Sequence, residues 1–208
     1  MYVAVAGNIG VGKSSLTRLL SERYGLEPIF EAVDENPYLP DFYEDMRRWG
    51  FHSQMFFLAE RLRQHLRQVN PGERVIQDRT VYEDAAVFAR NLWREGVLDD
   101  RDWDAYQRMY EAIAATLRPP DLLVYLRASV PTLEARISLR GRDYESDIDP
   151  GYLERLNALY ESFVTRYELS RVVVVPADEL DFVRSPGDLD ATFAILERHG
   201  LVPPIVRG

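Results

Sequence analysis

Apolar residues follow two alternating patterns along the 208 residues of the chain. Short runs rich in aliphatic and β-branched residues predict buried strands at 1–6, 27–32, 74–78, 122–127 and 171–176. Between these runs, apolar residues recur at the spacing of one helix face, and glycine or proline follows several of the segments. This spacing predicts helices at 14–24, 51–69, 81–96, 102–117, 130–141, 150–167 and 188–200.

Strands that alternate with helices predict a parallel sheet with helices on both faces. The chain shows no internal repeat and no low-complexity linker, so we expect a single domain over residues 1–208. The stretch DENPYLPDF at 34–42 is rich in turn-forming residues and predicts an irregular connection. The pattern as a whole therefore predicts an α/β fold with a doubly wound sheet of five parallel strands.

Composition and charge narrow the class of protein. No apolar run approaches the roughly 20 residues that cross a bilayer, and the first residues lack the regions of a signal peptide. The formal net charge of −9 repels nucleic acid polymers. The chain has no cysteine, and its three histidines lack the spacing of zinc ligands. We therefore expect a cytoplasmic protein with no nucleic acid partner, no membrane partner and no zinc site.

The stretch GNIGVGKSS at residues 7–15 lies between the first predicted strand and the first predicted helix. Gly7 and the run Gly12-Lys13-Ser14 satisfy the P-loop pattern G-x-x-x-x-G-K-[ST]. In a P-loop, backbone N–H groups surround a phosphate chain, the lysine reaches the β- and γ-phosphates, and the serine hydroxyl binds Mg²⁺. We therefore predict an ATP-binding loop formed by Gly7, Asn8, Ile9, Gly10, Val11, Gly12, Lys13, Ser14 and Ser15.

A P-loop indicates a nucleotide as the phosphoryl donor, but it does not identify the group that accepts the phosphoryl. The guanine-binding motif N-K-x-D of a GTPase is missing from the sequence, and the chain is short for a motor ATPase. Ligands of a doubly wound sheet bind at the carboxyl ends of its strands, where Glu31, Asp78 and Arg79 are expected. Phosphoryl transfer needs a carboxylate on the Mg²⁺ side, and Asp78 is the candidate. Arg79 is placed to neutralise charge on the transferring group.

Acidic residues at the expected acceptor entry favour an uncharged acceptor. A phosphate group carries about two negative charges, which Glu31, Asp34 and Glu35 would repel in a partly desolvated cleft. An alcohol tolerates these carboxylates and needs one of them to accept its proton. Glu31 is therefore the candidate general base, and a hydroxyl group is favoured over a phosphate as the acceptor, although Arg79 partly offsets the acidic charge.

The chain resembles the deoxynucleoside kinase family in the stretches GNIGVGKS, FEAV, YEDMRRWGFHSQMFFLAERLR, DRTVYEDAAVFARNL and RISLRGRDYE. These stretches follow the family order from residue 1 to about 165, and ENPYL is most similar to the bacterial deoxyadenosine/deoxyguanosine kinase branch. The resemblance implies a P-loop kinase fold with an arginine-rich lid at about 136–150. It also implies transfer of the γ-phosphoryl group of Mg²⁺·ATP to the 5′-hydroxyl of a deoxyribonucleoside, for nucleotide salvage.

The resemblance also implies roles for residues around the sugar. Glu31 matches the general base that takes the proton of the 5′-hydroxyl. Arg79 matches the arginine that orients this base and contacts phosphate. Tyr43 and Glu145 match the pair that holds the 3′-hydroxyl of the sugar.

The nucleobase pocket that the resemblance implies includes five further residues. Gln54 matches the amide that hydrogen-bonds the base edge, and Phe88 matches the ring that stacks on the base, with Phe57 beside it. Arg61 and Asp84 match a pair that reads the base together; without the resemblance they would be interpreted as an ordinary surface salt bridge. Such a pair suits a base with an amino group, which favours a purine first and cytosine second.

Three arginines match the lid of the family. Arg136 and Arg140 share one helix face, and Arg142 follows Gly141, where the chain can bend. When the lid closes over ATP, these arginines are expected to surround the phosphate oxygens and stabilise the transition state.

Departures from the family pattern leave alternatives open. Ala32 stands where many members have proline, and Asn36 stands where animal members have tryptophan. Asp78 belongs to an Asp-Arg-Thr run that replaces the commoner Glu-Arg-Ser; its side chain is one methylene shorter, which leaves open a metal contact through water. The alternatives are a deoxycytidine-preferring kinase, a thymidylate-type nucleotide kinase and a nucleotide-binding regulatory switch. The helices at 81–95 and 102–117 either bury against a second subunit, as in the homodimers of the family, or cover the sheet.

Overall fold

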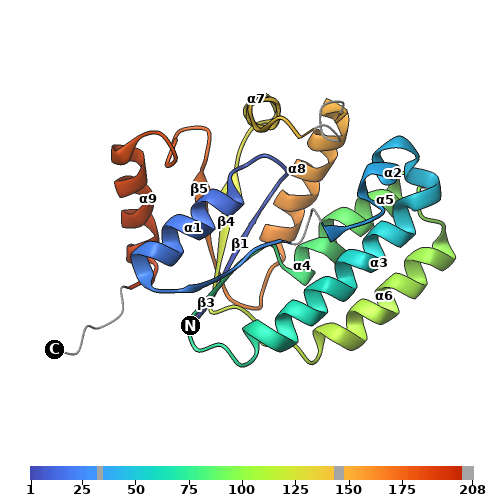
Figure 1. Cartoon of the computed structure of the whole chain (residues 1–208), viewed down its shortest axis with the longest axis horizontal. Helices are drawn as coiled ribbons and strands as arrows, with labels where there is room; N and C mark the ends of the chain where they lie inside the picture. The colour runs from blue at the N-terminus through green and yellow to red at the C-terminus, as the bar shows by residue number, and fades with distance from the viewer. Residues whose placement is uncertain (32–34, 143–147, 203–208) are drawn as a thin grey trace.

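The computed structural model describes residues 1–31, 35–142 and 148–202 of the chain. All strand pairs in this part of the chain are parallel, and the sheet has the order β2-β3-β1-β4-β5 (Figure 1). The strands are β1 (Tyr2–Gly7), β2 (Glu27–Ile29), β3 (Val75–Asp78), β4 (Leu122–Arg127) and β5 (Arg171–Pro176). The five-stranded parallel sheet expected from the hydrophobic pattern is therefore confirmed.

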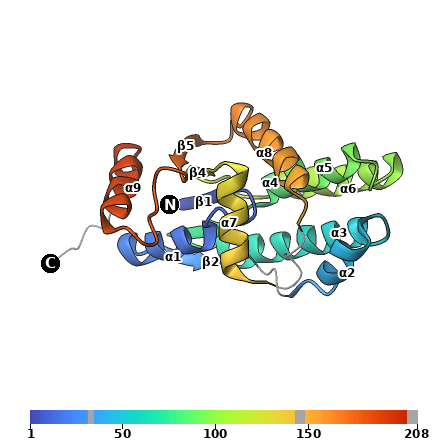
Figure 2. The same cartoon turned by 90° about the horizontal axis from the view of Figure 1, so that it is seen from above.

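Helices lie on both faces of the sheet, with α1 on one side and α8 on the other (Figure 2). The helical segments are α1 (Lys13–Tyr24), α2 (Leu39–Glu44), α3 (Met46–Gln64), η2 (His65–Val69), α4 (Val81–Glu83), η3 (Asp84–Ala89), α5 (Arg90–Arg94), α6 (Asp100–Ala114), α7 (Val130–Arg140), α8 (Pro150–Thr165) and α9 (Pro186–Arg198). None of these helices is long and apolar enough to cross a bilayer.

The central strand β1 is buried along its whole length, because β3 and β4 flank it and helices cover both of its faces. This position explains why the sequence MYVAVA is apolar without alternation. The carboxyl ends of β1, β2 and β3 meet at one edge of the sheet, so the residues that follow these strands are brought together there.

The prediction of an irregular connection at 34–42 is wrong in its second half, because α2 begins at Leu39. Leu39 and Phe42 are buried in a small apolar cluster with Leu92 and Leu98. Contacts between distant parts of the chain thus stabilise a short helix that local composition does not predict. The helix expected from residue 51 likewise begins earlier, at Met46, because the Asp45 side chain accepts a hydrogen bond from the Arg48 N–H and caps it.

Two of the long predicted helices contain π-helical stretches. Residues 65–69 form η2 at the end of α3, and residues 84–89 form η3 between α4 and α5. Such stretches often occur at functional sites. In this chain η3 carries Asp84 and Phe88, two of the residues expected to bind a nucleobase.

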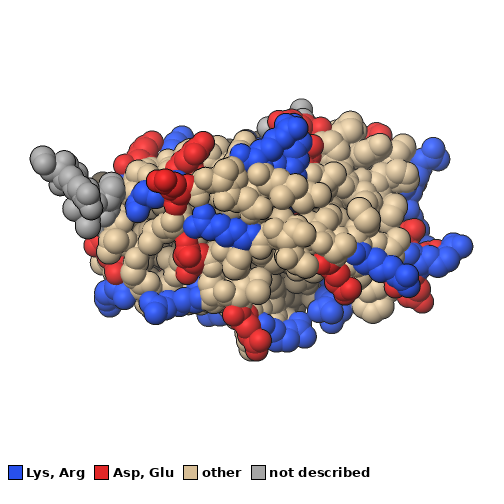
Figure 3. All heavy atoms as spheres, turned by 90° about the horizontal axis from the view of Figure 1, so that it is seen from below, with Lys and Arg blue, Asp and Glu red and all other residues tan. Residues whose placement is uncertain are grey.

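Acidic and basic side chains are interspersed over the face of the molecule shown in Figure 3. This mixed distribution differs from the basic stripe that binds a nucleic acid backbone. The charges that matter for the predicted chemistry lie instead in a cavity at the carboxyl end of the sheet.

Candidate active site

The loop between β1 and α1 has the backbone of a phosphate cradle. Gly7, Gly10 and Gly12 have φ angles of 147°, 80° and 104°, which favour glycine. At Gly7 a Cβ atom would also lie 2.7 Å from the Leu126 carbonyl oxygen, so a larger residue does not fit. The loop leads directly into the N-terminus of α1, whose unpaired N–H groups favour an anion.

Asn8 fixes this loop to α8. Its side-chain nitrogen Nδ2 donates to the Leu153 carbonyl oxygen at 3.0 Å and to Asn157 Oδ1 at 2.8 Å. Its oxygen Oδ1 accepts a hydrogen bond from the Ile9 N–H at 2.7 Å. The loop is therefore held in shape by side-chain contacts before any phosphate binds, which is the preorganisation that a phosphate site needs.

Lys13 extends from the start of α1 into this loop, where its Nζ donates to the Asn8 carbonyl oxygen at 3.0 Å. The side chain is buried, and burial lowers the pKa of Lys13 to about 8, with the positive charge of Arg79 acting in the same direction. A bound phosphate chain would favour the charged amine, as a P-loop lysine requires.

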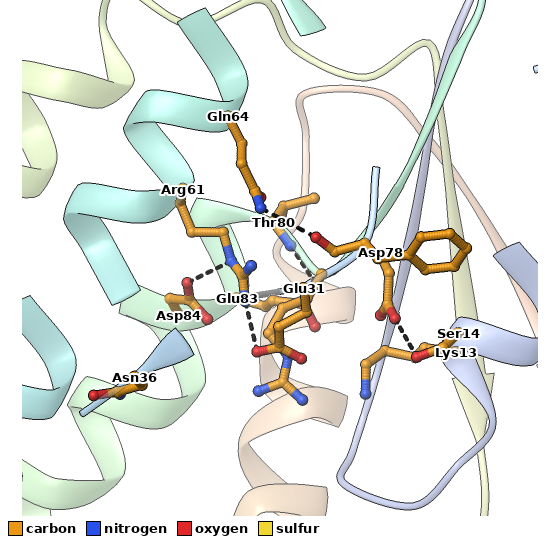
Figure 4. Close-up of polar contacts among 12 residues, drawn as sticks. Lys13, Ser14, Glu31, Asn36, Arg61, Gln64, Asp78, Thr80, Glu83 and Asp84 are labelled. Carbon is orange, nitrogen blue, oxygen red and sulfur yellow. Dashed lines mark hydrogen bonds and ion pairs between the residues drawn. The ribbon is translucent and has the colours of Figure 1, made fainter. Parts of the chain in front are cut away.

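Ser14 and Asp78 meet beside the loop, where the serine hydroxyl donates to Asp78 Oδ2 at 2.5 Å (Figure 4). Burial raises the pKa of Asp78, and its second oxygen Oδ1 is buried without a hydrogen-bond partner among the described residues. No cluster of three or more carboxylate, histidine or cysteine residues forms a metal site in that same part of the chain. A hydroxyl and one carboxylate with a spare oxygen fit Mg²⁺, which commonly binds through one or two carboxylates and substrate phosphates.

Glu31 follows β2 and points toward Arg61 (Figure 4), and it also forms an ion pair with Arg79. Its Oε1 accepts a hydrogen bond from Arg61 Nη2 at 2.6 Å, and its Oε2 lies 3.3 Å from Arg79 Nε. Burial alone would raise the pKa of Glu31, but Arg79, Arg61 and Lys13 outweigh it and lower the pKa to about 2. The carboxylate is therefore ionised at neutral pH and able to accept a proton from an alcohol.

The backbone around Glu31 is held by α3, because Gln64 Nε2 donates to the Phe30 carbonyl oxygen at 3.1 Å. Arg79, at the end of β3, adopts a left-handed conformation with φ of 65°, which is uncommon for a residue with a side chain. Its N–H donates to the Val5 carbonyl oxygen at 3.0 Å, and its guanidinium lies 4.2 Å from the centre of the Phe88 ring. Local strain of this kind often occurs at functional sites.

Arg61 and Asp84 form a buried pair, so their interpretation as a surface salt bridge is wrong. Arg61 Nε donates to Asp84 Oδ2 at 3.0 Å, and Arg61 is only 1% exposed. Burial raises the pKa of Asp84, while the adjacent Arg61 acts against this shift. The guanidinium therefore joins Asp84 on one side to Glu31 on the other.

A cavity of about 830 Å³ connects these groups, within the usual range of ligand sites. The expected site residues that line it are Ile9, Gly10, Gly12, Lys13, Ser14, Ser15, Glu31, Tyr43, Gln54, Phe57, Arg79, Phe88, Arg136, Arg140 and Arg142. The expected residues that lie outside its lining are Gly7, Asn8, Val11, Arg61, Asp78 and Asp84. Glu145 lies outside the residues that the structure describes.

Arg136, one of the three arginines expected in the lid, lines the cavity and also hydrogen-bonds to the backbone beside the P-loop. Its Nη1 donates to the Val11 carbonyl oxygen at 2.8 Å, and its Nη2 donates to the Ala177 carbonyl oxygen at 2.7 Å. In this structure Arg136 thus ties the P-loop to the segment after β5. The contribution of Arg136, Arg140 and Arg142 to phosphate binding stays a prediction.

Sequence reasoning missed the segment 181–184, which lines the cavity beside the P-loop. A Cβ atom on Gly12 would lie 3.2 Å from the Phe182 ring, so the two approach closely. No motif marks this segment in the sequence. Its position after the carboxyl end of a parallel strand is the only available signal.

Glu83 is a second missed residue, although Thr80-x-x-Glu83 is a recognisable capping box. Its Oε1 accepts a hydrogen bond from the Thr80 N–H at 2.8 Å. Its Oε2 accepts one from the Tyr160 hydroxyl at 2.7 Å and one from the Gly7 N–H at 3.4 Å. One fully buried carboxyl group therefore joins the start of the P-loop, the turn after Arg79 and α8.

We expect Glu83 to make the protein less stable as the pH rises. Burial raises the pKa of Glu83 from 4.5 to about 7, so its contribution to stability is fully present below pH 4.5 and is lost toward pH 7. The shift corresponds to about 3 kcal/mol. Urea unfolding of the wild type and of Glu83→Gln at both pH values tests this. The stability of the wild type relative to the variant should fall by about that amount at the higher pH, and a constant difference would contradict it.

Comparisons with known proteins agree with this geometry. A family model described as deoxynucleoside kinase matches residues 3–194. A deoxyadenosine/deoxycytidine kinase of Bacillus subtilis is 34% identical over 190 residues, covering 90% of this chain and 88% of that protein. A deoxyguanosine kinase of the same organism is 34% identical over 199 residues, covering 91% of this chain and 92% of that protein. The solved structure of an M. mycoides deoxyadenosine kinase with bound dATP has a TM-score of 0.83 at 32% identity, covering 95% of this chain and 100% of that chain.

Proposed function

Because this chain belongs to the deoxynucleoside kinase family, we propose that it transfers the γ-phosphoryl group of ATP to the 5′-hydroxyl of a purine deoxyribonucleoside. One observation carries the proposal: the ionised carboxylate of Glu31 lines the same cavity as Lys13 and the P-loop. A base for an alcohol and a cradle for phosphate thus face one space, as phosphoryl transfer to a hydroxyl group requires.

Both substrates would bind in the cavity that Lys13 lines. The phosphates of ATP bind along the loop 9–15, and the segment 181–184 is placed to contact the donor nucleoside. The acceptor binds on the side of Gln54, Phe57 and Phe88, where aromatic rings suit a flat base and the amide suits its polar edge. This arrangement brings the 5′-hydroxyl to Glu31, between the two nucleosides.

The transfer depends on placement and charge. Glu31 accepts the proton of the 5′-hydroxyl while the oxygen attacks the γ-phosphorus. Arg79 and Lys13 stabilise the negative charge on the transferring group. Arg140 and Arg142, which also line the cavity, add positive charge near the phosphates. Ser14 and Asp78 would hold Mg²⁺, which neutralises charge on the ATP phosphates.

The purine preference rests on the relatives and on the pocket. Proteins named deoxyadenosine kinase and deoxyguanosine kinase are 34 to 37% identical to this chain over most of its length. Because one relative is named deoxyadenosine/deoxycytidine kinase, deoxycytidine is the second candidate. The reaction would return a preformed nucleoside to the monophosphate pool, so we infer a role in nucleotide salvage in the cytoplasm.

The proposal also includes a homodimer. Its support is that one face of α6 is buried whereas another face of the same helix is exposed. Tyr106 and Ile113 of α6 pack into the core, whereas Met109 on the same helix is 48% exposed. The first face covers the protein interior, and we infer that the face with Met109 contacts a second subunit. Sedimentation equilibrium would show a mass of twice 24.1 kDa for the dimer.

An acceptor competition tests the function. ATP labelled at the γ-phosphate is incubated with the enzyme, the four deoxynucleosides and thymidine monophosphate in one mixture. We expect label in the monophosphates of deoxyadenosine and deoxyguanosine first, with deoxycytidine next. Preferential labelling of the thymidine diphosphate would establish a nucleotide kinase instead. ATP binding without labelling of any acceptor would establish a regulatory switch.

A further inference from the structure

We propose that Glu83 is a positioning residue for phosphoryl transfer: its carboxyl group holds the start of the P-loop and the turn that carries Arg79 at a fixed distance from each other. The inference rests on the proposed function. It concerns the two cationic sides of the site, since Lys13 begins α1 directly after the P-loop and Arg79 follows β3. Glu83 is not among the residues that line the cavity, so it would act through these residues and not on the substrates.

The contacts of Glu83 go beyond those of a capping box. In a capping box the glutamate accepts a hydrogen bond from the N–H of the cap residue, which here is Thr80 at 2.8 Å (Figure 4). Its second oxygen Oε2 accepts hydrogen bonds from the Tyr160 hydroxyl at 2.7 Å and from the Gly7 N–H at 3.4 Å. The residue is 0% exposed, whereas the side chain of Asp99, which caps α6, is 50% exposed. Capping of a helix therefore accounts for only one of these three bonds.

The two backbone groups that Glu83 binds lie where the chain leaves the sheet toward the site. Thr80 directly follows Arg79, so the bond to its N–H fixes the peptide that ends the left-handed turn at a φ of 65°. Such a conformation persists only where surrounding contacts enforce it. Gly7 is the last residue of β1 and the first glycine of the P-loop, and its φ of 147° also turns the chain. One carboxyl group thus contributes to the direction of both exits.

Tyr160 of α8 holds this carboxyl group from a well-packed position. Its ring packs edge-on against Phe88 with the ring centres 6.2 Å apart, and it stacks with Tyr125 at 5.8 Å. Phe88 in turn lies 4.2 Å from the guanidinium of Arg79. Burial and the nearby Glu83 raise the pKa of the Tyr160 hydroxyl, which therefore stays a donor at neutral pH. Glu83 is thus bound by a helix that also supports the side chain of Arg79.

The chemistry of these contacts shows which substitution separates the bridge from the cap. All three described partners of Glu83 are donors, namely two backbone N–H groups and one hydroxyl. Glutamine has the same size but supplies one oxygen and one NH2 group. If its oxygen faces Thr80, its NH2 group faces the Gly7 N–H, and the reverse orientation places the NH2 group against Thr80. In either orientation one backbone bond is lost, so Glu83→Gln breaks the bridge without leaving a cavity.

The first experiment measures kcat and KM of Glu83→Gln with deoxyadenosine at saturating ATP. We expect kcat to fall at least roughly tenfold, because about 1 Å of misplacement at a site can cost 10²-fold in rate. The KM for deoxyadenosine should equal that of the wild type, because the residues proposed to bind the base keep their places. Asp99→Ala is the matched control, since it removes the cap of α6 from a residue outside the cavity lining. We expect the control to lose stability and to keep the wild-type kcat.

A double-mutant cycle with Arg79→Lys shows whether Glu83 acts through Arg79. Lysine keeps the positive charge of Arg79 but lacks the planar guanidinium that the turn directs into the site. Effects of residues that act as a unit do not add, so we expect Glu83→Gln to lower kcat by less than about twofold in the Arg79→Lys background. The same factor in both backgrounds would show that the effect does not pass through Arg79 and would overturn the inference.

Tyr160→Phe tests the inference even if Glu83→Gln fails to fold. It removes one hydroxyl group and keeps the ring against Phe88, so we expect kcat to fall by about threefold, as for the loss of one hydrogen bond. This loss should disappear in the Arg79→Lys background. An unchanged kcat in either variant, once folded, would assign Glu83 to the stability of the fold alone. Failure of the wild type to phosphorylate any deoxynucleoside would instead contradict the proposed function.

Discussion

Replacement of Glu31 by glutamine is expected to lower kcat for deoxynucleoside phosphorylation by about 10²–10⁴-fold, the range for a positioned general base. Glutamine keeps the size of the side chain and can still hydrogen-bond the 5′-hydroxyl, but its amide cannot take the proton. Arg61 retains Asp84 as a partner at 3.0 Å, so the substitution does not leave that arginine without a counter-charge. Release of ADP with deoxyadenosine as acceptor measures the effect.

The matched control for this variant is Glu35→Gln. Glu35 lies four residues further along the chain, its side chain is 66% exposed, and its nearest cation is Arg63 at 3.7 Å. We expect its kcat to equal that of the wild type. ATP binding by isothermal titration should be unchanged in both variants. A loss of ATP affinity in Glu31→Gln as large as its loss of turnover would show that Glu31 supports the fold of the site and does not act as the base.

Replacement of Lys13 by methionine is expected to lower kcat by about 10²–10³-fold, as for the loss of one preorganised group that stabilises transition-state charge. Lys13 is buried beside the P-loop carbonyl of Asn8 and has no substitute among the arginines that line the cavity, because none extends from within the loop. Methionine keeps the length and apolar stem of the side chain. Single-turnover kinetics at saturating ATP measures the chemical step apart from ATP binding.

Arg18→Met is the control for Lys13. It removes one positive charge from the same helix, α1, but at an exposed position. We expect wild-type kcat for this control, because a screened surface charge contributes little at the site. Equal losses in the two variants would show that the net charge of the molecule, and not the amine at the P-loop, limits the reaction.

Much of the fold could be predicted from the sequence because it depends on local patterns. The apolar runs at 1–6 and 122–127 become central strands since both of their faces are buried, and the P-loop follows because its glycines lie in register with Lys13. The predicted strand at 27–32 is the exception, since β2 ends at Ile29 and the chain then leaves the sheet toward Glu31.

Other parts of the site depend on contacts between distant residues. The spacing in the sequence does not show that Arg61 is buried between Glu31 and Asp84, because these residues come from three separate segments. The same holds for Arg136, whose hydrogen bonds to Val11 and Ala177 exist only once the segment after β5 lies beside the P-loop.

The most direct test of the central claim compares two nucleosides that differ only at the 5′ carbon. Deoxyadenosine and 2′,5′-dideoxyadenosine carry the same base, but only the first has the 5′-hydroxyl whose proton we propose that Glu31 accepts. We expect ADP and deoxyadenosine 5′-monophosphate to form in equal amounts with deoxyadenosine, and no phosphorylated product with the analogue. A phosphorylated form of the analogue would show that another hydroxyl is the acceptor and would contradict the assignment of Glu31.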